Sequence, residues 1–233
     1  MKRVFNFSLI LFSCLTLAGC QSKEDKANKL IDEYMFKHLH DYNSYEVVET
    51  TVDTLYNTPF LDSKCIEAAI ASITHDTMAD EYEKAAARNK STMEIWSDGW
   101  SSTAKSEYNK AKEEYISNQY LLITEKIAWM KSWKVITNRC EELNGEEMIG
   151  WLVVHSYRCN NRGGNSVLCD KLFLIDPNFK EIVSSYDSDD ENINKAINLI
   201  SSTIQNKEIT EEMLDSLIVQ YEDLLERCSK NRE

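Results

Sequence analysis

Apolar residues recur at helical spacing over several long parts of the chain. Such spacing places apolar side chains on one face of a helix. It predicts a helix over about 24–39, and two helices over about 62–137 with a break near Ser97–Gly99. A further helix follows residue 191, and a last helix follows Thr210, a good N-terminal cap. The predicted buried faces of these two helices consist of Ile193, Ile197, Ile200 and Ile204, and of Leu214, Leu217, Ile218, Tyr221, Leu224 and Leu225.

Three other segments are rich in β-branched and aromatic residues, which favour strands. The first is Ser44–Val52. The other two, 148–158 and 166–175, flank a stretch (160–165) of residues that tolerate positive φ, so they predict an antiparallel hairpin. Pro177 ends its second strand, because proline lacks the amide donor of a ladder. The order of elements predicts an α+β fold: a small antiparallel sheet of about three strands, a long helical hairpin insert and C-terminal helices.

The N-terminus has the form of a secretion signal. Lys2 and Arg3 precede an apolar run, Val4–Leu17, that ends in Leu17-Ala18-Gly19-Cys20. This arrangement is typical of a signal peptide, and its last four residues resemble a bacterial lipobox. The resemblance implies cleavage before Cys20, a diacylglyceryl group on its thiol and a fatty acid such as palmitate on the new amino terminus. More than one chain gives a stable membrane anchor.

The predicted organisation is therefore a signal peptide (1–19), a lipidated tether (20–26) and a single α+β domain (27–233). The formal net charge of the whole chain is −13, and loss of Lys2 and Arg3 makes it −15 for the mature protein. Such a charge repels nucleic acid, so we expect no nucleic-acid partner. Cationic or neutral partners fit it better, although an acidic surface also serves solubility alone.

Five cysteines remain when Cys14 and Cys20 are set aside, and none lies in a Cys-x-x-Cys pair. Export permits disulfides, and an odd number leaves at least one thiol unpaired within the chain. Cys159 and Cys169 flank the hairpin turn. They face each other, and can form a disulfide, if paired residue numbers sum to 328; a sum of 327 puts Cys159 opposite Leu168 and leaves free thiols. The remaining cysteines are Cys65, Cys140 and Cys228.

The best cluster of functional side chains lies in the hairpin. Alternation along a strand puts His155 and Tyr157 on one face, and Arg158 and Lys171 are the other members of the cluster. A histidine general base needs an orienting partner and a nearby nucleophile, and no Gly-x-Ser-x-Gly elbow supplies one. A small envelope hydrolase is thus one hypothesis. The other hypothesis is that these residues are structural: the histidine is half-buried, and the arginine pairs with a carboxylate across the sheet.

No metal or cofactor site is expected. The acidic run Asp187–Glu191 offers oxygen ligands of the kind that calcium prefers. However, no glycine stands at the sixth position, and Asn198 occupies the place of the closing glutamate. A helix cap that begins at Ser188 is the preferred interpretation.

Two segments, Leu39–Val48 and Ile149–Asn165, resemble a family of small Gram-negative lipoproteins of unknown function. That family has a comparable Ser-Tyr-Glu strand before a helical insert and a comparable His-x-Tyr-Arg…Gly-Gly hairpin after it. The resemblance implies no activity. Gln21 is not the aspartate that favours inner-membrane retention, so we expect the outer membrane, and the acidic run that follows it is typical both of surface-exposed lipoproteins and of a plain tether.

The expected function is an envelope-anchored lipoprotein that acts by binding or by structural interaction. Its expected partners are the membrane, through the N-terminal lipid, and an unknown protein or glycan. The hydrolase that would use the His155 cluster is the alternative.

The first prediction is that Cys20 is the lipidated terminus of the mature chain. Mass spectrometry of the protein purified from membranes should give an N-terminal peptide that begins at a lipid-modified Cys20. Cys20→Ala should release a soluble or uncleaved form. A mature chain that begins at Met1, or an unmodified Cys20, would contradict the prediction.

Overall fold

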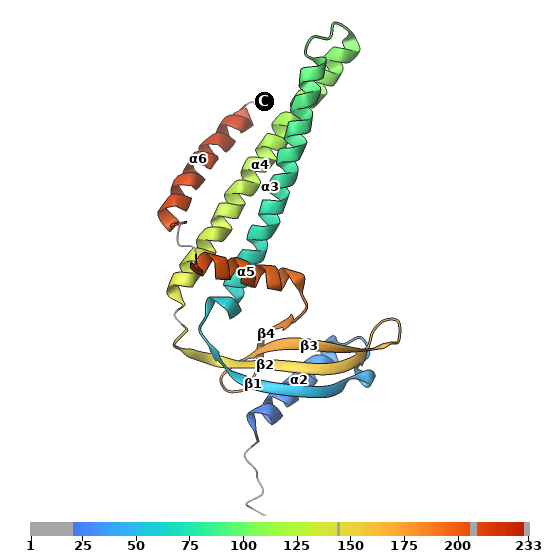
Figure 1. The fold of residues 1–233 in the computed structure, drawn as a ribbon, viewed down its shortest axis with the longest axis vertical. Coiled ribbons are helices and arrows are strands. Elements are labelled where there is room, and N and C mark those ends of the chain that lie inside the picture. Colours follow the sequence, from blue (N-terminus) through green and yellow to red (C-terminus); the bar gives the residue numbers. More distant parts are fainter. Residues whose placement is uncertain (1–20, 144, 206–208, 231–233) are drawn as a thin grey trace, which may run out of the picture. The chain divides into compact units, whose positions relative to one another are not determined.

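The structure is a computed structural model that describes residues 21–143, 145–205 and 209–230. The predicted signal peptide and Cys20 lie outside these ranges. The described residues form an α+β fold, as expected (Figure 1). Its elements are α2 (Lys23–His38), β1 (Glu46–Tyr56), α3 (Ser63–Trp96), α4 (Ser102–Glu142), β2 (Met148–Asn160), β3 (Ser166–Ile175), β4 (Ile182–Asp187), α5 (Glu191–Gln205) and α6 (Glu211–Lys230), with short 3-10 helices at Tyr42–Ser44 and Pro59–Leu61.

The chain forms two compact units. The sequence predicts a single domain over 27–233. The sheet unit comprises the described residues up to Leu55 together with Ile149–Ser188. The helical unit comprises the described residues of Tyr56–Met148 and Asp189–Glu233. No helix among the described residues is long and apolar enough to cross a membrane.

The sheet unit is built on an antiparallel sheet of four strands in the order β1-β2-β3-β4. Three strands were expected, and β4 is the additional one. Its sequence, Ile-Val-Ser-Ser-Tyr-Asp, is short and largely polar, so its pattern resembles that of a loop. It can be this polar because it lies at the edge of the sheet, where one side of the strand has no neighbour to pack against.

Helix α2 covers one face of the sheet. Its buried residues Ala27, Ile31 and Met35 are spaced by four, and they pack on Val153 and Phe173 of the central strands. The helix begins with a capping box: the Ser22 hydroxyl accepts from the Asp25 amide at 3.0 Å, and the Asp25 carboxylate accepts from the Ser22 amide at 3.1 Å. Residues 23–26 of the predicted tether are therefore helical.

The β2–β3 hairpin has a register that the sequence analysis did not predict. Paired residue numbers sum to 326, as in Arg158 opposite Leu168, so both sums considered, 328 and 327, are wrong. The reason is the turn. The Asn161 side chain accepts from the Gly163 amide at 2.9 Å and from the Asn165 amide at 3.1 Å, which centres the loop on Gly163. Gly164 supplies the positive φ, +77°.

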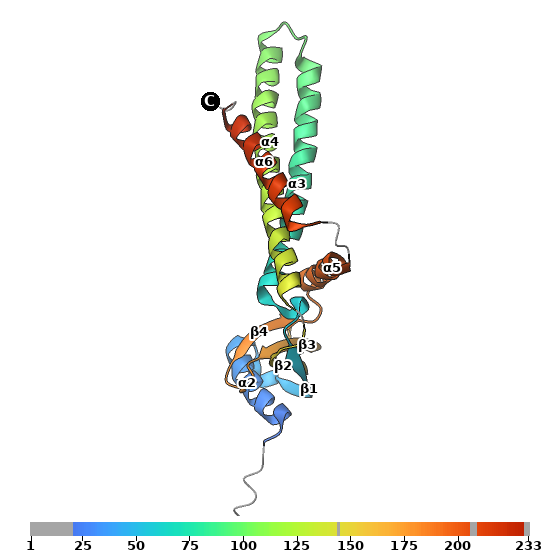
Figure 2. The same ribbon diagram turned by 90° about the vertical axis from the view of Figure 1, so that its left-hand side faces the viewer.

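The helical unit is organised by the antiparallel pair α3 and α4, which lie side by side in both ribbon views (Figures 1 and 2). The break at 97–101 is where the sequence predicts it, and Gly99 is required there, because a Cβ would lie 2.1 Å from that of Ala104. The far half of α3 is largely polar and exposed. Small residues on both helices of the pair are buried; these are Ala79 and Ala86 of α3 and Ala104 and Ala111 of α4.

Helices α5 and α6 begin at side-chain caps. The Asp190 carboxylate accepts from the Asn192 amide at 2.8 Å, so Asp190 caps α5. The predicted cap residue, Ser188, instead donates from its hydroxyl to the Asp170 carbonyl. The Thr210 hydroxyl accepts from the Met213 amide at 3.3 Å, which confirms the predicted cap of α6. Leu214 and Ile218 of α6 pack on α4.

The second prediction compares two phenylalanines of the sheet unit. Phe173 is fully buried between the sheet and α2, whereas Phe36 is 67% exposed. Phe173→Ala should lower the free energy of unfolding of the sheet unit by about 3–5 kcal/mol, because it removes buried apolar area and leaves a cavity. Phe36→Ala should cost about 1 kcal/mol at most. Urea denaturation with hydrogen exchange of β2 amides measures both, and equal losses would contradict the described core.

Candidate functional site

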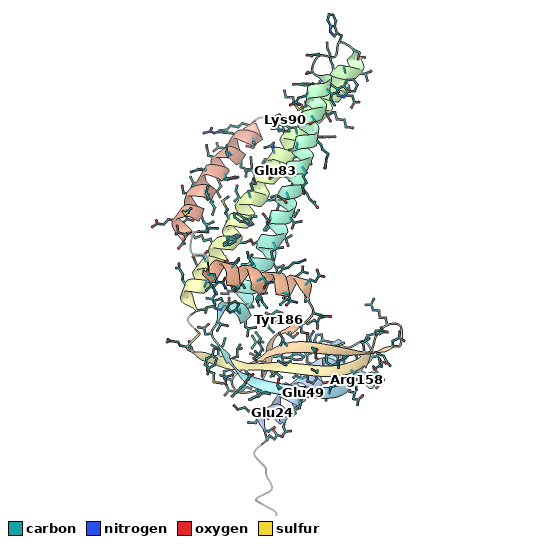
Figure 3. All side chains as sticks on the ribbon, in the orientation of Figure 1. Glu24, Glu49, Glu83, Lys90, Arg158 and Tyr186 are labelled. Carbon is teal, nitrogen blue, oxygen red and sulfur yellow. The ribbon has the colours of Figure 1, made fainter. Side chains whose placement is uncertain are left out.

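The hairpin places the predicted cluster on two different faces of the sheet. His155 and Tyr157 share the face under α2 and are buried, as alternation predicts. Arg158 is on the opposite face and exposed, near the turn end of β2 (Figure 3). Lys171 lies opposite His155 in the register, and its Nζ is 2.6 Å from the Asp187 carboxylate on β4. Arg158 therefore does not join the histidine in one site.

Both ring nitrogens of His155 are hydrogen-bonded. The Thr50 hydroxyl donates to the Asn28 amide oxygen at 2.7 Å, so its oxygen is left to accept from His155 Nδ1 at 2.8 Å. The imidazole is then the Nδ1–H tautomer, and Nε2 accepts from the Tyr45 hydroxyl at 2.7 Å. These contacts form one buried network, which we call the His155 network: Asn28 from α2, Thr50 from β1, Tyr45 and His155.

The His155 network holds a neutral imidazole. His155 is 0% exposed, and burial lowers its pKa to about 4. Burial likewise raises the pKa of Tyr45 above its ordinary value, so its hydroxyl keeps the proton that it donates. Tyr157 stacks against the imidazole with ring centroids 5.7 Å apart, and burial raises its pKa too. The network is uncharged at neutral pH.

This geometry gives the histidine a structural role. A general base needs a nitrogen free to take a proton from a substrate, and in His155 one nitrogen donates to Thr50 while the other accepts from Tyr45. The network links α2, β1 and β2 in the middle of the core. The hydrolase hypothesis thus gains no support from the cluster that suggested it.

Cys159 and Cys169 are free thiols in the structure. Cys159 pairs with Val167 and Cys169 with Tyr157, so the two cysteines are diagonal neighbours on one face. Diagonal positions are about 7–8 Å apart between Cα atoms, which is at or beyond the upper limit of disulfide geometry. The two thiols are nevertheless in side-chain contact, and the disulfide between them stays a prediction.

No group of three or more histidine, cysteine or acidic side chains among the described residues could hold a metal ion. The acidic run before α5 does cap the helix, but through Asp190 and not through Ser188.

The helical unit contains a groove that the sequence analysis missed. It has a volume of about 320 Å³ and lies between α3, α4 and α6. Lys126, Trp129 and Met130 of α4 form its floor. Leu217 and Tyr221 of α6 form one wall, and the α3 wall consists of Asp76, Ala79, Asp80 and Glu83. We call this the α3–α6 groove.

The groove is open because part of the apolar face of α6 is not covered by another helix. Leu217 and Leu224 were both predicted to be core residues, but they are 38% and 43% exposed, whereas Leu214 on the same helix is 1% exposed. Ion pairs fix one edge of α6 to α4, with Lys134 at 2.8 Å from Asp215 and Lys131 at 3.1 Å from Glu222. The other edge, with Leu217, faces the groove. Two features of the sequence could have indicated this groove. Acidic residues stand at i, i+4 and i+7 of α3, and the apolar stripe of α6 is wider than contact with one helix requires.

The α3 wall of the groove is strongly acidic. Asp76, Asp80 and Glu83 are exposed, and none of them forms an ion pair with another side chain in the described part of the chain (Figure 3 labels Glu83). Their spacing places them along one face of α3 over about 10 Å. The groove therefore combines a floor of Trp129, Met130 and one cation, Lys126, with a row of three carboxylates, which outnumber that cation.

Comparison with known proteins adds no relative: no family model, no curated protein and no solved structure matches the chain. The resemblance to Gram-negative lipoproteins stays a hypothesis.

The third prediction concerns the pH dependence of the sheet unit. Burial lowers the pKa of folded His155 to about 4, whereas an unfolded histidine titrates near about 6.5. Between these values only the unfolded state takes up the proton. The stability that comes from the neutral ring is thus present above about pH 6.5 and is lost as the pH falls towards 4. From pH 7 to pH 5 this histidine should lower the free energy of unfolding by about 2 kcal/mol.

Urea denaturation with hydrogen exchange of β2 amides at the two pH values measures this loss. His155→Gln should be less stable at pH 7, since it disrupts the network, but its stability should change by about 2 kcal/mol less between the two pH values. His40→Gln, at an exposed position of the same unit, is the matched control and should behave as the wild type does. An unchanged pH dependence in His155→Gln would show that the ring is not held neutral.

Proposed function

We propose that the protein is a lipid-anchored envelope protein that binds a partner protein through the α3–α6 groove. The observation that carries this proposal is the groove itself, in which apolar side chains lie next to three carboxylates that form no ion pair with another described side chain. The envelope location rests on the lipobox resemblance. The expected occupant is an amphipathic helix of the partner that bears lysine or arginine residues.

The shape of the groove favours a helix. Two helices, α3 and α6, form its walls, and a third, α4, forms its floor. A helix laid between them would complete a bundle and cover Leu217, which is 38% exposed. Helix-in-groove recognition of this kind uses apolar anchors at i, i+3, i+4 and i+7.

The charges favour a cationic occupant. Three carboxylates at i, i+4 and i+7 of α3 match basic side chains at the same spacing on a facing helix. Trp129 and Tyr221 present aromatic rings over which a lysine or arginine head can also lie. Opposite charges across an interface raise the association rate and select partners, and the net charge of −13 extends the same attraction over a longer range.

The hydrolase alternative is not favoured by any observation on the described residues. Both nitrogens of His155 are occupied, and the aromatic residues around it pack in the core of the sheet unit. A binding role needs no such group.

The fourth prediction tests the groove with a designed peptide. The probe is an amphipathic helical peptide with lysines at i, i+4 and i+7 beside a leucine stripe, and calorimetry measures its affinity for the full-length protein in detergent. Asp80→Lys should weaken binding about ten-fold or more, equivalent to about 1.4 kcal/mol. It does so because it replaces an attractive carboxylate with a repelling ammonium group. Leu217→Glu should also weaken binding, because it places a charge on the apolar wall.

Glu94→Lys is the matched control: it makes the same change in net charge at an exposed position of α3 outside the groove. It should change the affinity less than three-fold. Equal losses in Asp80→Lys and Glu94→Lys would show attraction by net charge only. Equal affinity for a peptide with glutamates in place of the lysines, or binding of a small organic cation with no binding of the peptide, would contradict the proposed occupant.

A further inference from the structure

A pair of cysteines lies where the start of α3 meets the end of α4. Cys65 is in the first turn of α3, and Cys140 is in the last turn of α4. Asp62 joins these two turns. Its carboxylate accepts from the Cys65 amide at 2.8 Å and forms a bidentate pair with Arg139, next to Cys140, at 2.6 and 3.1 Å. Charge-assisted bidentate pairs fix geometry well, so the two cysteines are held close together.

The two thiols differ in accessibility. Cys65 is 0% exposed. Cys140 is partly exposed and lines a cavity of about 620 Å³, formed with residues of α4 and α5 and with Ile209 and Thr210 before α6. A reagent that enters this cavity can reach Cys140 but not Cys65.

The two thiols also differ in acidity. The Cys65 thiol, as a hydrogen-bond partner, lowers the pKa of Cys140. The same contact with Cys140, together with burial, raises the pKa of Cys65. The thiolate is the nucleophilic form of cysteine. The reactive form is thus favoured at the accessible member of the pair.

We propose that Cys140 and Cys65 form a dithiol redox site, in which Cys140 is the attacking thiolate and Cys65 the resolving thiol. The co-reactant is a disulfide, either of a small thiol compound or of a disulfide-exchange protein. The Cys140 thiolate attacks one sulfur of that disulfide, which forms a mixed disulfide and releases the first thiolate. Cys65 then loses its proton and attacks the Cys140 sulfur, which forms the Cys65–Cys140 bond and releases the second thiolate.

The step is balanced: the chain loses two protons and two electrons, and the co-reactant disulfide is reduced to two thiols. The bond would close the open end of the α3–α4 hairpin, opposite the turn at Gly99. The proposal is independent of the α3–α6 groove, since the two sites share no residue. Export, where it takes place, brings the chain into a compartment that holds such oxidants.

The test uses the reduced, full-length protein in detergent with oxidised glutathione, followed by alkylation under denaturing conditions and peptide mapping. The wild type should give a peptide cross-linked through Cys65 and Cys140, two hydrogens lighter than the reduced pair. In Cys65→Ala, glutathione should accumulate on Cys140, because no resolving thiol removes it. In Cys140→Ala, Cys65 should carry at least ten-fold less glutathione, because it is buried.

Cys228→Ala is the control, and it should give the same cross-link as the wild type. Circular dichroism of each variant checks that the helices are intact, and the wild-type map tests the bond without any variant. Full alkylation of both Cys65 and Cys140 after oxidation would overturn the proposal. So would a cross-link between Cys159 and Cys169 in its place, or equal modification of Cys65 and Cys140 in the two single variants.

Discussion

The need to satisfy both nitrogens of a buried neutral imidazole constrains the whole sheet unit. An unpaired polar atom in a core costs about 1–3 kcal/mol, and His155 is fully buried. Its partners come from separate segments: Thr50 from β1, and Tyr45 from the chain that precedes that strand. Thr50 in turn needs Asn28 of α2 as an acceptor. Helix α2 and strands β1 and β2 can therefore take only the arrangement that closes this chain of hydrogen bonds, while the apolar contacts around Phe173 supply most of the driving force.

The helical unit is governed by a different constraint, the width of the apolar stripe on α6. A stripe that serves one neighbouring helix needs only a narrow seam, and Leu214 and Ile218 fill that seam against α4. Leu217 and Tyr221 extend the stripe beyond it. On the other edge Lys134 pairs with Asp215 and Lys131 pairs with Glu222, and these exposed ion pairs add modestly to the orientation that the Leu214 seam sets. The groove between α3 and α6 follows from this balance.

The sequence predicts the elements of this fold well and their contacts less well. Helical spacing, Thr210 and the break near Gly99 locate α3 to α6, since those signals are local. The polar edge strand β4 and the hairpin register were missed. A six-residue strand with two serines lacks alternation, and the register depends on how the Asn161 side chain closes the turn. For the candidate site, alternation correctly paired His155 with Tyr157, but the partners of His155 are about 105 and 110 residues away in sequence, which no local pattern reveals.

The surroundings of a residue, more than its type, decide whether it can serve as a functional site. Histidine is the residue that catalysis most often uses, yet this one has no free nitrogen and no opening to solvent. A single exposed leucine or aspartate on a protein surface is ordinary, yet on the two walls of one groove these residues combine apolar area with three carboxylates that form no ion pair with another described side chain. Binding energy comes from groups that are unsatisfied in the free protein and satisfied in the complex. By that criterion the three carboxylates of α3 and the exposed edge of α6 are better placed to recognise a partner than the saturated core of the sheet unit.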